Sequence, residues 1–135
     1  MKKFARMIAL ALVMVMSVAM LASCGAPNSD PEKALAALKD NDYVAAEDKY
    51  IIPTALALLG VKDIDCVVSG SATIDEKFET VTIIYFEDKD AANEAWEKVE
   101  EYANKEKDEK AENWVCKKSG AMIYFGTTNG VKAAK

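Results

Sequence analysis

The feature that most constrains the fold is a long amphipathic helix pattern set between two pairs of strand-like segments. Apolar residues recur at helical spacing across residues 88–107, while charged residues occupy the other side. Glu94 with Lys98, and Glu101 with Lys105, are oppositely charged pairs four residues apart, each worth roughly 0.2–0.5 kcal/mol. The pattern predicts a helix with one apolar face. That face consists of Ala92, Ala95, Trp96, Val99, Tyr102 and Ala103.

Strands are predicted on both sides of this helix. Residues 64–74 alternate between two faces, and residues 78–86 are rich in β-branched and aromatic side chains. Residues 113–117 and 121–126 repeat the arrangement around a turn at Lys118-Ser119-Gly120. Two hairpins with a helix between them predict an α+β fold. We expect a two-layer sandwich, in which the long helix packs on one face of an antiparallel sheet.

Two shorter helices are predicted ahead of the first hairpin. Asp30 followed by Pro31 is a typical helix start, and apolar residues then recur at helical spacing as far as Asn41. A second helix is predicted around Pro53, with Gly60 as its stop. This second helix is almost entirely apolar, which favours burial.

The first 24 residues have the pattern of an export signal. Lys2, Lys3 and Arg6 precede an apolar run over residues 7–22 that contains one serine as its only polar member. A membrane-spanning helix needs about 20 apolar residues, so a cleaved signal peptide over residues 1–23 is the better prediction. The run ends in Leu21-Ala22-Ser23-Cys24.

These four residues resemble the lipobox of bacterial lipoprotein precursors. The resemblance implies that the thiol of Cys24 receives a diacylglycerol, that a peptidase cuts between Ser23 and Cys24, and that the new N-terminus can be acylated as well. Two or three acyl chains hold a protein durably at a membrane surface. We therefore expect a protein anchored to the extracytoplasmic face of the cell membrane. The alternative is a secreted protein cut near Ala22, with no lipid on Cys24.

Cleavage leaves enough chain for one domain. Removing residues 1–23 from a chain of 135 leaves 112, which is too short for two domains. Residues 24–30 are small, polar and proline-bearing, which predicts a lipidated cysteine on a flexible tether, and residues 31–135 would form the single domain. All 22 acidic residues remain but only 14 of the 17 basic ones, a net charge of −8. That charge argues against a nucleic-acid partner.

The residue types present exclude several kinds of chemistry. The chain contains no histidine, which rules out Ser-His-Asp and Cys-His hydrolases and removes the commonest zinc ligand. A cluster of acids outside the long helix lacks the spacing of a calcium-binding loop, and no glycine-rich phosphate loop occurs. We therefore predict no cofactor, no metal site and no enzymatic activity. The acids, expected on a solvated strand edge, are Asp63, Asp65, Asp75, Glu76 and Glu79.

Two cysteines lie beyond Cys24, in strands of different hairpins. A disulfide between Cys66 and Cys116 would close a loop of about 50 residues, worth roughly 4 kcal/mol in the chain-entropy model. The alternative is two unpaired thiols that pack as small apolar side chains. A catalytic thiol is not expected, because no histidine is present to activate it.

Adjacent aromatic residues suggest a candidate interaction face. Neighbouring residues of a strand point to opposite sides, so Tyr85-Phe86 and Tyr124-Phe125 each place an aromatic ring on both faces of the sheet. If helices cover one face only, some of these rings are exposed and mark a partner surface. The alternative is that the first two helices cover the second face.

Together these patterns predict a lipid-anchored, non-enzymatic protein-interaction module at the cell envelope. The layout of lipobox, short linker and small acidic domain resembles that of small bacterial lipoproteins of uncharacterised role. A small-ligand or metal-binding lipoprotein is the alternative, and a small envelope enzyme comes third. The expected partners are the membrane, through the lipid on Cys24, and an envelope protein.

Overall fold

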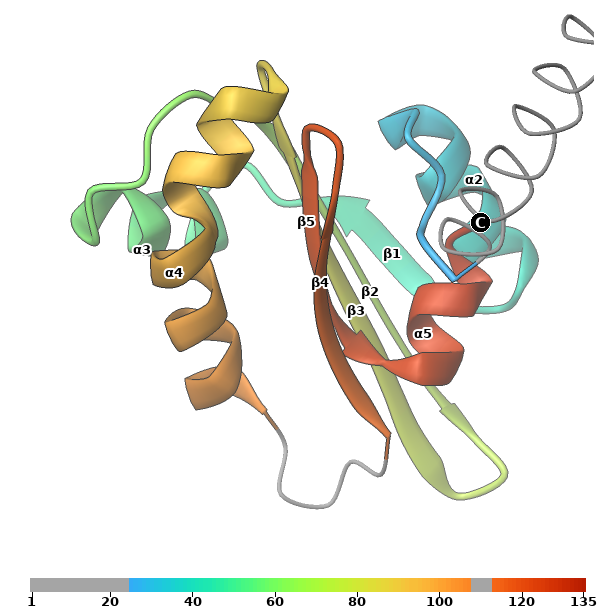
Figure 1. The fold of residues 1–135 in the computed structure, drawn as a ribbon. Helices are drawn as coiled ribbons and strands as arrows, with labels where there is room; N and C mark the ends of the chain where they lie inside the picture. Colours follow the sequence, from blue (N-terminus) through green and yellow to red (C-terminus); the bar gives the residue numbers. More distant parts are fainter. Residues whose placement is uncertain (1–24, 108–112) are drawn as a thin grey trace, which may run out of the picture.

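The computed structural model describes residues 25–107 and 113–135, which form an antiparallel sheet with helices on both sides (Figure 1). The predicted signal peptide and Cys24 lie outside the described residues. Within the described ranges, no helix is both long enough and apolar enough to cross a membrane.

The sheet has five strands, and both predicted hairpins are confirmed. Along the sheet the order is β1-β2-β3-β5-β4, and every neighbouring pair is antiparallel. The first hairpin joins β2 to β3 and the second joins β4 to β5, so β3 is the middle strand. The strands are β1 (Val44–Glu47), β2 (Ile64–Ile74), β3 (Lys77–Phe86), β4 (Trp114–Ser119) and β5 (Met122–Thr127).

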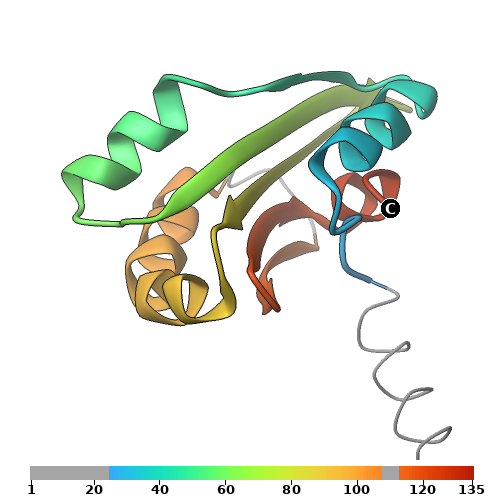
Figure 2. The ribbon, with the colours of Figure 1, turned by 90° about the horizontal axis from the view of Figure 1, so that it is seen from above.

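Helices cover both faces of the sheet. The long helix α4 (Lys89–Glu106) and the short helix α3 (Ile51–Leu58) lie on one face, while α2 (Pro31–Asp40) and α5 (Thr128–Ala133) lie on the other (Figures 1 and 2). The predicted α+β class, with a long helix packed on an antiparallel sheet, is confirmed. The two-layer arrangement needs a correction, because the described residues form three layers. We call the two helical layers the α3–α4 layer and the α2–α5 layer.

The two outer layers exist because the middle of the sheet is apolar on both sides. Ile83 and Ile84 are adjacent in β3 and point to opposite faces, yet both are 0% exposed. Ile84 packs in the core under the α3–α4 layer with Val99 of α4, whereas Ile83 packs in the core under the α2–α5 layer with Leu38 of α2. A sheet with two apolar faces needs a cover on each.

The segment that precedes α2 is not the flexible tether that its composition predicts. Ala26 is 7% exposed and belongs to the core under the α2–α5 layer. The backbone N–H of Asn28 donates to the carbonyl of Ala134 at 2.8 Å, and the buried hydroxyl of Tyr85 donates to the carbonyl of Asn28 at 2.7 Å. A buried tyrosine hydroxyl needs such a partner, and this segment supplies it. We call residues 26–30 the N-terminal strap.

Candidate interaction surface

The candidate aromatic interaction face is buried, because helices cover both faces of the sheet and not one. Tyr85 and Tyr124 are 5% and 3% exposed and lie in the core under the α2–α5 layer. Phe86 and Phe125 are 4% and 3% exposed and lie in the core under the α3–α4 layer. Because each face of the sheet has its own helical cover, none of the four rings can meet a partner without unfolding.

Of the two arrangements open for the cysteines, the structure has the one without a disulfide. Cys66 and Cys116 are both unpaired among the described residues, and each is partly buried. Their strands, β2 and β4, are separated by β3 and β5, which places them roughly 14 Å apart at the usual strand spacing. Cys66 packs against the core under the α2–α5 layer and Cys116 against the other core. The sheet therefore lies between the thiols, which pack as small apolar side chains.

The two thiols are expected to react slowly in the folded protein. Burial, with smaller contributions from nearby carboxylates, raises the pKa of both Cys66 and Cys116 to about 11. At about pH 8 both groups are then protonated, and the protonated thiol is not the nucleophile. Alkylation followed by mass spectrometry should be slow until denaturant is added, and reductant should not change the melting temperature. A melting temperature that depends on reductant would contradict this assignment.

The acids of this cluster lie in different places: Asp65 is exposed in β2, Asp63 precedes that strand, and the other three lie at or after the β2–β3 turn. Asp75 and Glu76 form the β2–β3 turn with φ of 52° and 65°, and Asp63 also has a positive φ of 61°. Glu79 is 7% exposed, and it accepts a hydrogen bond from Nδ2 of Asn129 at 3.1 Å. Glu79 is therefore not on the solvated edge predicted for it. In the part of the chain that the structure describes, no three histidine, cysteine or acidic residues are grouped to hold a metal ion.

Helix α3 presents the exposed apolar surface that the sequence interpretation missed. Its composition predicts burial, but of the residues of α3, all of which the structure describes, only Leu56 is buried. Large apolar side chains at both ends of the helix are instead open to solvent. We define the α3 apolar surface as Tyr50, Ile51, Leu58 and Leu59, which are 77%, 77%, 84% and 45% exposed.

This helix is apolar on more than one side. Ile52 and Leu56 face inward and pack in the core under the α3–α4 layer. Ile51, Ala55 and Leu58 are spaced i, i+4 and i+7, which places them together on a neighbouring side of the helix. No charged residue occurs from Tyr50 to Val61. A helix that is apolar all round is normally buried, so its outward side is a candidate contact surface for a partner.

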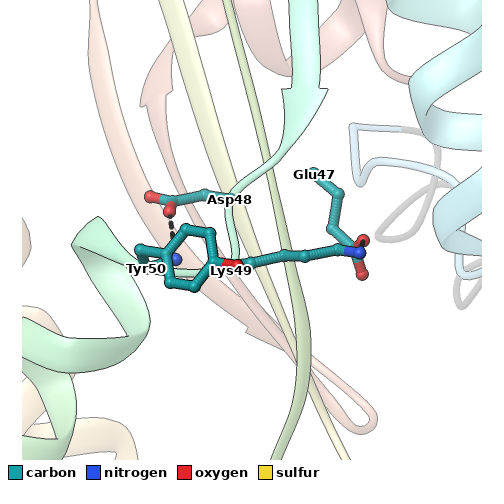
Figure 3. A network of polar contacts seen from close by, with 4 residues as sticks. All are labelled: Glu47, Asp48, Lys49 and Tyr50. Atoms are coloured by element: carbon teal, nitrogen blue, oxygen red, sulfur yellow. Dashed lines mark hydrogen bonds and ion pairs between the residues drawn. The ribbon is translucent and has the colours of Figure 1, made fainter.

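Asp48 fixes the start of α3. Its carboxylate accepts hydrogen bonds from the backbone N–H groups of Tyr50, Ile51 and Ile52, at 3.0, 2.8 and 3.0 Å; the contact with Tyr50 is drawn in Figure 3. Partial burial raises the pKa of Asp48, but these three hydrogen bonds outweigh it and hold the pKa below its ordinary value. The negative charge also suits the positive end of the helix dipole. The carboxylate thus satisfies amides that α3 cannot satisfy itself.

Figure 3 also shows Lys49 beside Glu47. The lysine Nζ lies 3.7 Å from a carboxylate oxygen of Glu47, with side chains 66% and 43% exposed. A pair this open to solvent adds little stability. Asp48 is therefore the residue of this segment that holds α3 in place.

Replacing Asp48 with Asn is expected to cost about 1–2 kcal/mol of unfolding free energy near neutral pH. A carboxyl group whose pKa is lowered by folding stabilises the protein above its unfolded pKa of about 3.9, and this stability is lost as the pH falls through the folded pKa. The difference between wild type and Asp48→Asn in urea unfolding should therefore shrink between about pH 7 and about pH 2.5.

Asp30→Asn is the matched control for this measurement. Asp30 caps α2 but accepts one helix N–H, from Glu32 at 3.0 Å, so its replacement should cost less than that of Asp48. An Asp48→Asn effect of equal size at both pH values would mean that the carboxylate charge does not stabilise the start of α3.

A hollow of about 370 Å³ borders α3 where it approaches β2. Pro53 and Ala57 of α3 form one wall, and Ile64 and Cys66 form the other, with Asp65 at the rim. It opens beside the helix that carries the α3 apolar surface.

Comparison of the chain with models of protein families, with curated proteins and with solved structures gave no match. The class that the structure defines is an α+β protein with a five-stranded antiparallel sheet between two helical layers. The candidate interaction surface rests on the geometry of this chain alone.

Proposed function

We propose that this protein is a lipid-anchored, extracytoplasmic interaction module whose α3 apolar surface binds an envelope protein. The observation that carries the proposal is the exposure of Tyr50, Ile51 and Leu58 on a helix segment without any charged residue. Exposed apolar patches of this kind commonly mark protein interaction sites. The resemblance of residues 21–24 to a lipobox supports the membrane anchor.

The spacing of the exposed residues indicates the kind of partner. Apolar anchors at i, i+4 and i+7 fit the mode in which one protein lays a helix into the apolar groove of another. Exposed Ile51 and Leu58 stand at i and i+7, with partly buried Ala55 between them at i+4, and the hydroxyl of Tyr50 suits the polar rim of such a contact. The expected partner is therefore a protein with an apolar groove about as long as α3. At 1.5 Å per residue, that is roughly 12 Å.

The membrane anchor would compensate for the small size of this surface. A helix of eight residues buries less than the roughly 1,200 Å² typical of stable protein interfaces, so binding in solution is expected to be weak. Confining both partners to one membrane raises their effective concentration without any additional contact. A transient interaction between anchored neighbours is the form of binding that the geometry supports best.

Photo-cross-linking in native membranes tests this proposal. A photoreactive residue at position 58 is expected to capture one envelope protein, identified by mass spectrometry. The same residue at position 78 is the control, because Phe78 is also apolar and 50% exposed but lies at the start of β3. Equal capture from both positions, or only links between copies of this chain, would count against a specific partner at α3.

A further inference from the structure

The N-terminal strap leaves almost no free chain between Cys24 and the folded domain. Ala26 and Pro27 are buried, so Gly25 alone separates Cys24 from the first buried residue. One residue spans at most about 3.6 Å. A lipid on Cys24 would therefore emerge directly at the domain surface.

The strap is attached to two different parts of the domain. The N–H of Asn28 donates to the carbonyl of Ala134, just beyond α5, at 2.8 Å. The carbonyl of Asn28 accepts from the hydroxyl of Tyr85, which comes from β3 and is 5% exposed, at 2.7 Å. Within the strap, the N–H of Asp30 donates to Oδ1 of Asn28 at 2.9 Å. Contacts with a helix end and with the middle strand restrict rotation of the domain about the strap.

The α3 apolar surface lies far from this attachment. The strap runs beside α2 and α5, whereas α3 lies across the sheet at the other end of the molecule, in both Figure 1 and Figure 2. Lys132 of α5 and Lys135 are exposed close to the strap, because Ala134 is the residue that bonds Asn28. The charges of this layer are mixed, because anionic phospholipid head groups attract Lys132 and Lys135 but repel exposed Glu32 and Asp40 of α2.

We propose that the strap fixes the orientation of the domain on the membrane, with the α2–α5 layer against the bilayer surface and the α3 apolar surface turned away from it. This inference rests on the proposed lipid anchor at Cys24. We place the bilayer on the α2–α5 side because the segment that leads from Cys24 joins the domain on that side. The orientation leaves α3 accessible to a partner that projects from the same membrane.

Lysine acylation of the full chain in its native membranes tests the orientation. A water-soluble acylating reagent is applied, and the modification of each lysine is read by mass spectrometry. Compared with protein in detergent, Lys132 and Lys135 should react at least about threefold more slowly in membranes, because the head groups exclude the reagent. Lys49 and Lys62, which are exposed at the two ends of the α3 region, should react at equal rates in both conditions.

A flexible Gly-Ser insertion between Cys24 and Gly25 is the matched control. This variant keeps the lipid and the strap but lets the domain leave the surface, so protection of Lys132 and Lys135 should disappear. Equal labelling of all four lysines in a lipidated protein would overturn the orientation and leave the anchor intact. Protection that survives the insertion would also overturn the role of the strap. An acyl group missing from the Cys24 peptide in the same spectrum would overturn the anchor itself.

Discussion

The double substitution Ile51→Glu and Leu58→Glu should lower recovery of the cross-linked partner at least about thirtyfold. It places two carboxylates on the α3 apolar surface. Two central apolar anchors are worth about 2 kcal/mol or more at a typical interface, and burying a new charge adds a further cost. Because the side chains are 77% and 84% exposed, the folded domain loses little when they are replaced. Because position 58 carries Glu in this variant, the photoreactive residue is placed at exposed Thr54, four residues earlier on the same helix. Quantitative cross-linking from there in membranes, together with urea unfolding, measures both effects.

The matched control places the same two charges elsewhere. Ile74 and Phe78 flank the β2–β3 turn and are 42% and 50% exposed, so Ile74→Glu with Phe78→Glu changes apolar area and charge in the same way. Partner recovery should be unchanged in this variant. If both double variants lost the partner equally, the effect would come from net charge and not from α3.

Replacing Gly126 with Ala is expected to destabilise the domain by at least about 3 kcal/mol. A Cβ at this position would lie 2.2 Å from the carbonyl oxygen of Thr80 and 2.7 Å from the Cα of Val81. The backbone φ of +148° is also one that side chains rarely adopt. Because β3 is the middle strand, it cannot move away without disturbing both cores. Urea unfolding at neutral pH measures the loss.

Gly120→Ala separates the steric effect from the backbone effect. Gly120 also has a positive φ of +59°, but a Cβ there would meet nothing within 4 Å. This substitution should cost about 1 kcal/mol, the usual penalty for a left-handed conformation. If Gly126→Ala cost no more than Gly120→Ala, close contact between β5 and β3 would not be the reason for this glycine.

The parts of the fold that depend on local pattern could be predicted from the sequence. The strand predicted for residues 64–74 is β2 with the same bounds, and the helix predicted for residues 88–107 is α4. In each segment the apolar residues recur with the period of a strand or of a helix, and this period can be read from the sequence of the segment alone. The start of α2 at Asp30 and Pro31 followed from capping chemistry in the same way.

The parts that depend on how elements assemble could not be predicted in this way. Strand order decides whether two cysteines meet, and the order β1-β2-β3-β5-β4 keeps Cys66 and Cys116 apart. Tyr85-Phe86 and Tyr124-Phe125 did carry a usable signal, since strands that are apolar on both faces indicate a sheet covered on both faces. That signal favours the arrangement that the structure shows.

The α3 apolar surface and the strap were missed for a related reason. A helix that is apolar all round does not reveal which half faces the core, because that depends on where β2 and α4 lie. Residues 24–30 have the composition of a linker, but the hydrogen-bonding need of the buried Tyr85 hydroxyl holds Asn28 in place. Neither effect has a counterpart in the local sequence.

The attachment of Asn28 has a mechanical consequence for a protein held at its N-terminus. Tension applied through the proposed lipid anchor would reach Asn28 before it reaches α2, and hydrogen bonds there would pass part of it along two routes besides the backbone. One route passes through the carbonyl of Ala134 into the end of the chain, and the other passes through the Tyr85 hydroxyl into β3. Since β3 is the middle strand, the share of the load that passes through Tyr85 would reach the centre of the sheet and not an edge strand that could separate from it.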